Sequence, residues 1–290
     1  MSLCDEVRAA CAGIAQSARW VEIDTDAMGE VEPGPEPVLD PERHYLDGSR
    51  EDVAEYILAL DAINFGSGWF PTLRKRPGCS GYYTVSSALA DHYRTAGPWS
   101  AAELRAIDAT TVARVLGQEP GHELMGLYAR ALHDLGAFLG ERTALAVAEA
   151  AAGSAERLAQ TLGTGMELFE DRGFYKRAQI APNDLALAGV ADFHDLDRLT
   201  IFADNLVPHV LRVDGVLRYH PELARAIDTG ELLAPGAQER EIRACALHAC
   251  EQLAARFGVA PRTLDVWLWN RGQLPHYKAR PRHRTRTVFY

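Results

Sequence analysis

The sequence predicts an all-α protein, mostly helical and folded as a single domain over residues 1–290, with at most a minor hairpin. Apolar residues recur every three or four positions along most segments, which is the spacing of one helix face. Capping signatures, in which a hydroxyl precedes an acid by three positions, occur at Ser49 and Ser100. Residues 142–163 consist almost entirely of good helix formers. These observations favour a scaffold of packed helices.

The first 43 residues are expected to form a helix and an arm, ahead of a core that spans residues 44–290. Residues 3–18 have the apolar spacing of a helix. Residues 29–41 are rich in proline, glycine and acids, which favours a loop or an extended arm. Ser49 is then expected to start the first helix of the core.

The segment that follows this helix, Asp61–Pro71, places Gly66 and Gly68 beside Trp69 and Phe70. Glycines next to aromatic residues allow the backbone to approach a ligand closely, while a ring supplies a stacking surface. A helix end followed by a buried turn would produce the same pattern. The sequence leaves both interpretations open.

Two later helices are expected at residues 174–190 and 195–206, and Pro208 is expected to limit the second one. Residues 210–219 fit either a hairpin with Asp-Gly as its turn or a helix end followed by a short loop. The basic segment 276–290 is expected to be extended. Further helices are expected over residues 85–95, 237–257 and 261–270, and from Pro221 onward.

Composition narrows the classes of function. The formal net charge of −10 argues against a general binder of nucleic acids or membrane surfaces, because such binding depends on cationic neutralisation. The N-terminus does not resemble a signal peptide, and no apolar run approaches the roughly 20 residues of a membrane span. The five cysteines form no CxxC pair, which indicates reduced thiols. We therefore expect a soluble, cytoplasmic protein.

The common catalytic signatures are missing from the sequence: there is no GxGxxG or Walker loop, no HExxH and no GxSxG. One acid, Asp204, lies in an otherwise apolar sequence between Phe202 and Leu206. A carboxylate in such surroundings loses hydration and needs a compensating role. It could face a small-molecule cleft with Lys176, cap a helix, or pair with an arginine in the core. For Asp265, near a helix start, a favourable interaction with the helix dipole is the more common explanation.

Several longer segments carry a resemblance to a known family. They are LDAINF (60–65), SGWF (67–70), SGYYTVSSAL (80–89), FYKRAQI (174–180), LTIFADNLVPHVL (199–211), EIRACALHACE (241–251) and LDVWLWN (264–270). In this order they resemble the queuosine salvage protein family, the queuosine 5′-phosphate N-glycosylase/hydrolases, over roughly residues 44–290. The resemblance implies an all-α fold similar to that of the helix-hairpin-helix DNA glycosylases. It also implies hydrolysis of queuosine 5′-phosphate to queuine and ribose 5-phosphate.

The resemblance assigns Asp204 as the catalytic carboxylate, acting either as nucleophile or as an electrostatic stabiliser that positions a water. Queuine is a 7-deazapurine and has carbon where a purine has a basic ring nitrogen. An acid therefore cannot assist its departure in the ordinary purine way, and stabilisation of the oxocarbenium-like sugar becomes more important. Lys176 is the candidate for the 5′-phosphate.

Five further residues are expected to contact or enclose the substrate. Phe202 and Trp69 would stack on the base, and Asp265 and Asn270 would bind its polar edges or its cyclopentenediol arm, which carries a secondary ammonium. His44, at the end of the N-terminal arm, would close over the ligand.

No cofactor or metal is implied. The expected partners are the nucleotide substrate and the product queuine, with no nucleic-acid polymer and no membrane, and the chain is expected to act as a monomer. Two alternatives remain: a non-catalytic carrier of queuine or a related modified base, and a glycosylase that acts on nucleic acid.

Overall fold

A computed structural model describes residues 2–29 and 34–290 and confirms the predicted class: the chain is mostly helical, with one two-stranded sheet. The helices of the described residues are α1 (Leu3–Gln16), α2 (Arg50–Ala62), α3 (Gly81–Ala96), α4 (Ala101–Ala106), α5 (Ala109–Leu116), α6 (Glu123–Leu139), α7 (Ala144–Ala150), α8 (Ala155–Gly165), α9 (Lys176–Leu187), α10 (Leu206–Val213), α11 (Pro221–Asp228), α12 (Ala237–Phe257), α13 (Pro261–Arg271) and α14 (Pro275–Lys278). Strand β1 (Val21–Ile23) pairs antiparallel with β2 (Leu217–Tyr219), with Glu22 opposite Arg218.

Local capping explains where several helices begin. The predicted capping boxes are present at α2, where Ser49 and Asp52 hydrogen-bond reciprocally, and at α4, where Ser100 and Glu103 do the same. Helix α3 begins at Gly81, earlier than predicted, because the Ser80 hydroxyl accepts a hydrogen bond from the backbone of its first turn. The predicted arm has no helix or strand over residues 34–40, and its residues 30–33 lie outside the described part.

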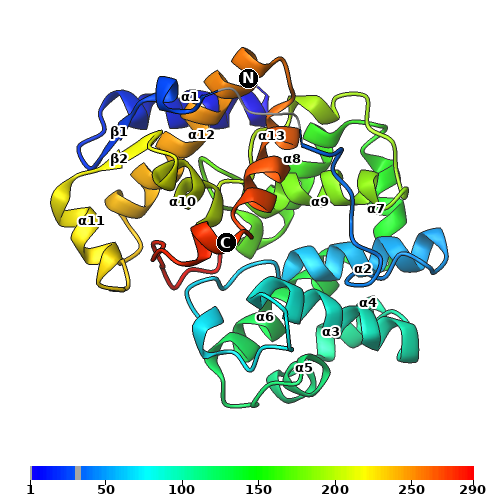
Figure 1. The fold of residues 1–290 in the computed structure, drawn as a ribbon. Helices are drawn as coiled ribbons and strands as arrows, with labels where there is room; N and C mark the ends of the chain where they lie inside the picture. The colour runs from blue at the N-terminus through cyan, green and yellow to red at the C-terminus, as the bar shows by residue number, and fades with distance from the viewer. Residues whose placement is uncertain (1, 30–33) are drawn as a thin grey trace.

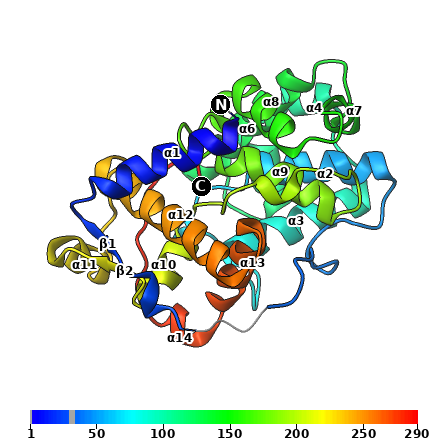
Figure 2. The ribbon, with the colours of Figure 1, turned by 90° about the horizontal axis from the view of Figure 1, so that it is seen from above.

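The helices form two groups with the C-terminal segment between them. In Figure 1 helices α2–α6, drawn in cyan and green, lie on one side, and Figure 2 shows α1 running along α12 on the other. The backbone N–H of Gly66, after α2, donates to the carbonyl of Tyr290 at 2.9 Å. Arg286 reaches Glu123 on α6 at 3.2 Å. The guanidinium carbon of Arg243 on α12 lies 4.5 Å from the ring centroid of Tyr290, so the last residues connect the two groups.

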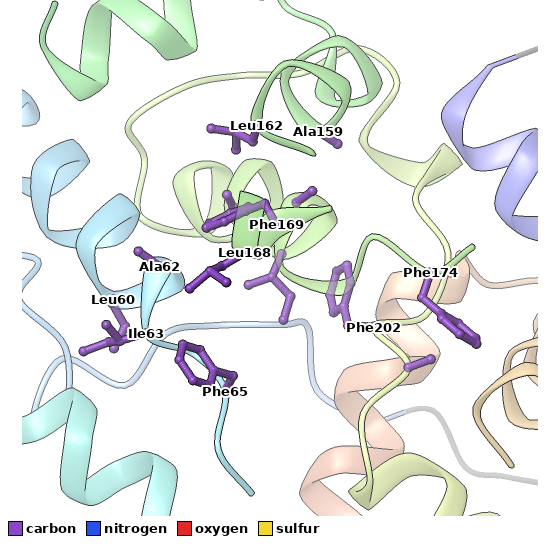
Figure 3. Packing of buried hydrophobic residues seen from close by; sticks show 14 of the residues in the cluster. Leu60, Ala62, Ile63, Phe65, Ala159, Leu162, Leu168, Phe169, Phe174 and Phe202 are labelled. Carbon is purple, nitrogen blue, oxygen red and sulfur yellow. The ribbon is translucent and has the colours of Figure 1, made fainter. Parts of the chain in front are cut away.

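A fully buried cation, Arg177 of α9, holds several backbone segments together. Its guanidinium donates to the carbonyls of Ala62 and Leu168 and, at 2.8 Å, to that of Val288. Its guanidinium carbon lies 4.7 Å from the ring centroids of both Phe65 and Phe169, which belong to the apolar cluster in Figure 3. A buried cation needs such partners because it has lost its hydration.

The predicted helix at 195–206 is wrong. Only a 3₁₀ turn, Leu196–Arg198, forms there, and residues 199–205 are irregular. Side chains from elsewhere satisfy this backbone: Gln179 accepts from the N–H of Thr200 at 2.9 Å, and Arg243 donates to the carbonyl of Ala203 at 2.9 Å. Pro208 does not end a helix but lies in the first turn of α10, where its missing N–H is not needed.

At residues 210–219 the helix-end alternative is correct, because α10 continues to Val213 and β2 then pairs with β1 near the N-terminus. The basic segment 276–290 starts within α14 and is irregular afterwards, apart from an isolated bridge between Leu232 and Arg284. Within residues 2–29 and 34–290, no helix combines the length and apolarity needed to cross a bilayer.

Candidate functional site

A cavity of about 480 Å³ lies where α9, α13 and the start of α3 meet the irregular segment before α10. This volume is in the range of small-molecule sites. The arm at residues 35–40 and the segment at 277–282 complete its walls. Six of the seven predicted site residues line it: His44, Lys176, Phe202, Asp204, Asp265 and Asn270.

Trp69 is not among the described residues that line this cavity. Its buried indole N–H donates to Glu123 at 2.7 Å, and Arg286 lies over its ring at 5.7 Å. Gly68 beside it approaches backbone rather than ligand, since a Cβ there would collide with the carbonyl of Thr285. The segment is therefore a buried turn at Gly68 and Trp69, whereas Asn64, Phe65, Ser67 and Phe70 of the same segment do line the cavity.

Asp204 combines two of the roles considered from the sequence. Its Oδ1 accepts hydrogen bonds from the backbone N–H groups of Leu206 at 2.7 Å and Val207 at 3.1 Å, so it caps the start of α10. The half-buried carboxylate also lines the cavity. The two N–H donors and the positive end of the helix dipole favour negative charge at this position. Asp204 is thus held in one orientation by backbone.

Lys176, the first residue of α9, lies between Asp204 and the end of α2. Its Nζ donates to the backbone carbonyl of Asn64 at 2.8 Å and to its side-chain Oδ1 at 3.2 Å. Burial lowers the pKa of Lys176 to about 8, against the opposing attraction of Asp204 and, more weakly, of Asp61. Asp204 is accordingly the charged group that most favours the protonated form of Lys176.

Two more carboxyls line the cavity. Asp265 accepts the backbone N–H of Phe202 at 2.9 Å, and burial together with the charge of Asp204 raises its pKa well above the usual range. Asp184 accepts a hydrogen bond from the side-chain amide of Asn183 at 3.0 Å, and burial raises its pKa to about 6. A carboxyl with a raised pKa can carry a proton and donate it in a hydrogen bond.

Asp61, the penultimate residue of α2, lies behind this surface. It is fully buried, and neither carboxyl oxygen has a hydrogen-bond partner among the described side chains and backbone. Burial and the neighbouring charge of Asp184 raise its pKa. We call Asp61, Asp184, Asp204 and Asp265, together with Lys176, the acidic wall.

Sequence reasoning missed Asp61 and Asp184, although signals for both exist. Asp61 lies among apolar residues in the same way as Asp204. Helix α9 directs one face at the cavity, where successive residues recur at helical spacing. This face consists of Lys176, Ile180, Asn183, Asp184 and Leu187.

Residues 35–40 of the N-terminal arm and His44 line one side of the cavity. The His44 Nδ1 lies 2.9 Å from the carbonyl of Asp40, and its Nε2 lies 3.0 Å from the hydroxyl of Tyr82 on α3. Burial lowers the pKa of His44, which favours a neutral ring. Trp267 of α13 donates to the carbonyl of Pro35 at 3.1 Å. The arm therefore contacts the core at Pro35 as well as at His44.

Three cations from the C-terminal part of the chain line the cavity as well: Lys278, Arg280 and Arg282. We call them the basic rim. Lys278 and Arg280 are exposed and Arg282 is half-buried. Burial lowers the pKa of Arg282, while the charge of Asp204 opposes the shift. The rim was missed because a basic segment in sequence resembles solvated surface.

The arrangement offers a fixed carboxylate, carboxyls that hold protons, cations, and the aromatic walls of Phe202, Tyr82 and Trp269. These groups suit a flat, polar ligand with an anionic end. No cluster of three or more His, Cys, Asp or Glu side chains able to hold a metal ion occurs in the described part of the chain.

Comparison with known proteins identifies relatives along almost the whole chain. A protein from Sphaerobacter thermophilus named queuosine 5′-phosphate N-glycosylase/hydrolase is 35% identical, and the match covers 96% of this chain and 95% of the relative. A protein of the same name from Nematostella vectensis is 28% identical, with 87% and 85% covered. One from Dictyostelium discoideum is 39% identical over 40% of each chain.

The family model described as queuosine salvage protein matches residues 43–290, which include every predicted site residue. The match excludes most of the N-terminal arm, yet that arm lines the cavity. With this match and the coverage of the Sphaerobacter relative, the chain belongs to the queuosine salvage protein family.

Proposed function

We propose that this chain hydrolyses the N-glycosidic bond of queuosine 5′-phosphate and releases queuine and ribose 5-phosphate. The observation that carries the proposal is Asp204, a carboxylate fixed by two backbone N–H groups in a cavity with aromatic walls and a basic rim. The names of the relatives support the same substrate.

Asp204 would act on the sugar. When the glycosidic bond breaks, its electron pair leaves with the base and positive charge develops at the anomeric carbon and ring oxygen. A carboxylate oriented before the reaction stabilises this charge without reorganising. In both the covalent and the water-mediated form of the mechanism, Asp204 faces the anomeric carbon. Its Oδ1 is engaged by α10, which leaves Oδ2 as the reacting oxygen.

The 5′-phosphate would be bound by Lys176 together with the basic rim. A phosphate dianion is matched by guanidinium forks and by the point charge of a lysine. Arg282 and Lys176 both lie close enough to Asp204 for its charge to affect their pKa values. Two cations near this carboxylate support binding of the sugar phosphate beside it.

The base would stack on Phe202 and be bound at its polar edges by Asp265 and Asn270. The hydrogen bond between Asp265 and the N–H of Phe202 fixes these two groups relative to each other. His44 would close the cavity over the bound nucleotide through its contact with Tyr82. A stacking role for Trp69 receives no support from the cavity walls.

The free nucleotide, rather than a nucleic-acid polymer, is the proposed substrate, acted on by a cytoplasmic monomer. The net charge of −10 disfavours binding of a polyanion, and the arm across the cavity restricts access to a small ligand.

Incubation with queuosine 5′-phosphate, followed by chromatographic detection of free queuine, tests the proposal. Release by the wild type and its loss in Asp204→Asn are expected. Tight binding of queuine without turnover would favour the carrier instead. Release from queuosine-containing tRNA but not from the nucleotide would favour a glycosylase that acts on nucleic acid.

A further inference from the structure

Asp61 and Asp184 form a pair of buried carboxyls that the proposed reaction has not yet used. Asp61 is buried at the end of α2 with both oxygens unpartnered among the described residues, and Asp184 lines the cavity from α9. Each raises the cost of ionising the other, because like charges cannot both be accommodated in such a site. A carboxyl that is buried without partners is stable only when it holds a proton.

We infer that Asp184, supported by Asp61, is the general acid that protonates the departing base. The inference rests on the proposed function and adds a residue to it. Asp184 would be catalytic because it lines the cavity, whereas Asp61 would be a positioning residue that keeps a proton on the pair. Two carboxyls with one proton titrate as a unit, so the proton can be on the member that faces the ligand.

The surroundings of Asp184 separate its role from that of Asp204. Burial is the main cause that raises the pKa of Asp184, and the side-chain amide of Asn183 and the charge of Lys176 only partly oppose it. Asp204 instead receives two backbone N–H donors at a helix start. Two carboxyls in one cavity with opposite environments are the usual arrangement for an acid and a partner that acts on the sugar.

Other titratable groups face the pair from the neighbouring elements. Asp184 influences the pKa of Tyr82 on α3 and of Asp265 on α13, so both lie near it. On α9 itself Lys176 is near Asp184, and Lys176 and Arg177 are near Asp61. These two cations and the side chain of Asn64 lower the pKa of Asp61, but burial and the charge of Asp184 raise it by more. The net direction for both carboxyls is a raised pKa, which favours a proton on the pair.

The proposed step balances without a further reactant. The C–N bond breaks, its electron pair moves to the base, and the proton of Asp184 passes to a nitrogen of the departing base. Water supplies oxygen to the anomeric carbon, and its proton restores the acid through solvent. The step does not need the ring nitrogen that a 7-deazapurine lacks, because the departing base has other nitrogens. General acids of this type contribute about 10²–10⁴-fold to a rate.

Values of kcat and KM for queuosine 5′-phosphate, measured between about pH 5 and pH 9, test the inference. For the wild type, kcat should fall as the pH rises through the pKa of the acid in the complex. Asp184→Asn should lose this alkaline fall and be about 10²-fold slower at the optimum, with KM nearly unchanged. Asp61→Asn should move the alkaline fall to lower pH, because Asp184 then titrates alone, without a second buried carboxyl to retain the shared proton.

Glu55→Gln is the matched control. Glu55 is also a carboxyl on α2, and burial raises its pKa, but it accepts the N–H of Ala144 away from the cavity. Its pH profile should equal that of the wild type. An alkaline fall that is the same in Asp184→Asn as in the wild type, apart from the one near pH 8 that belongs to Lys176, would overturn the inference. A raised KM with unchanged kcat would also overturn it, because it indicates substrate binding alone.

A second measurement remains decisive if Asp184→Asn does not fold. The infrared carbonyl band of protonated carboxyls should lose intensity in Asp61→Asn relative to the wild type at neutral pH, while the contribution of Asp265 remains. An unchanged band would overturn the shared proton. A wild type without any hydrolytic activity would instead contradict the proposed function, so the two failures are distinguishable.

Discussion

The acidic wall and the basic rim line the same cavity, but solvent reaches them differently. Three carboxyls of the wall and its lysine are buried, and their pKa values move toward the uncharged forms. Two cations of the rim are exposed and the third is half-buried. Burial therefore determines which side chains of the wall carry charge. The rim is largely in contact with solvent, where salt screens its charges. We therefore propose bond cleavage for the carboxyls of the wall and anion binding for the rim together with Lys176.

The largest expected effect comes from removing Asp204, the wall carboxyl that accepts two backbone N–H groups. Asp204→Asn should lower kcat by about 10²–10³-fold, the size of one preorganised electrostatic contact. The asparagine Oδ1 can still accept the N–H groups of Leu206 and Val207, so α10 should be retained. Steady-state kinetics with queuosine 5′-phosphate and circular dichroism measure both effects.

Asp197→Asn is the control for this substitution. Asp197 lies in the same segment, has a 73% exposed side chain, and pairs with Arg262 at the surface. Its replacement should leave kcat unchanged. Equal losses in the two variants would show that charge in this segment matters only for folding.

The rim should show its role through the phosphate. Arg282→Ala should lower kcat/KM for the nucleotide by about 10- to 100-fold, the range of one charged hydrogen bond, and change the value for unphosphorylated queuosine far less. Added salt should weaken nucleotide binding by the wild type more than by this variant. Arg284→Ala is the control, because Arg284 donates to the carbonyl of Gly230 and does not line the cavity.

Lys176→Ala in the same assay decides how far the wall and the rim act separately. A selective loss with the nucleotide would support its phosphate contact. An equal loss with both substrates would indicate that the charge of Lys176 acts on Asp204, the charged neighbour with the largest effect on its pKa. Lys176 would then not be the phosphate contact.

Local signals in the sequence were sufficient for most helices but not for the segment that carries Asp204. The capping boxes at Ser49 and Ser100 involve neighbours three residues apart, and both are present. Residues 199–205 remain irregular because Gln179 and Arg243, distant in sequence, satisfy their backbone. Such partners cannot be recognised from spacing.

Site residues could be predicted where a charged side chain lies within an apolar stretch of sequence. Asp204 is an acid among apolar residues and does line the cavity, and Asp61 carries the same unused signal. Arg280 and Arg282 give no such signal, because cations in a polar segment are normal on a surface. Their position follows from the way the last residues cross between the two groups of helices (Figure 1).

The smallest expected effect on activity tests where the cavity ends. Trp69→Phe should change kcat/KM by less than about 2-fold, because the ring of Trp69 does not line the cavity. The loss of its hydrogen bond to Glu123 should lower the free energy of unfolding by about 1 kcal/mol. Trp269→Phe is the comparison, since Trp269 lines the cavity and its ring packs at right angles to Tyr83. It should raise KM without a matching loss of stability. A loss of activity confined to Trp69→Phe would instead extend the base site behind the turn at Gly68, and would restore the stacking role that the sequence predicted.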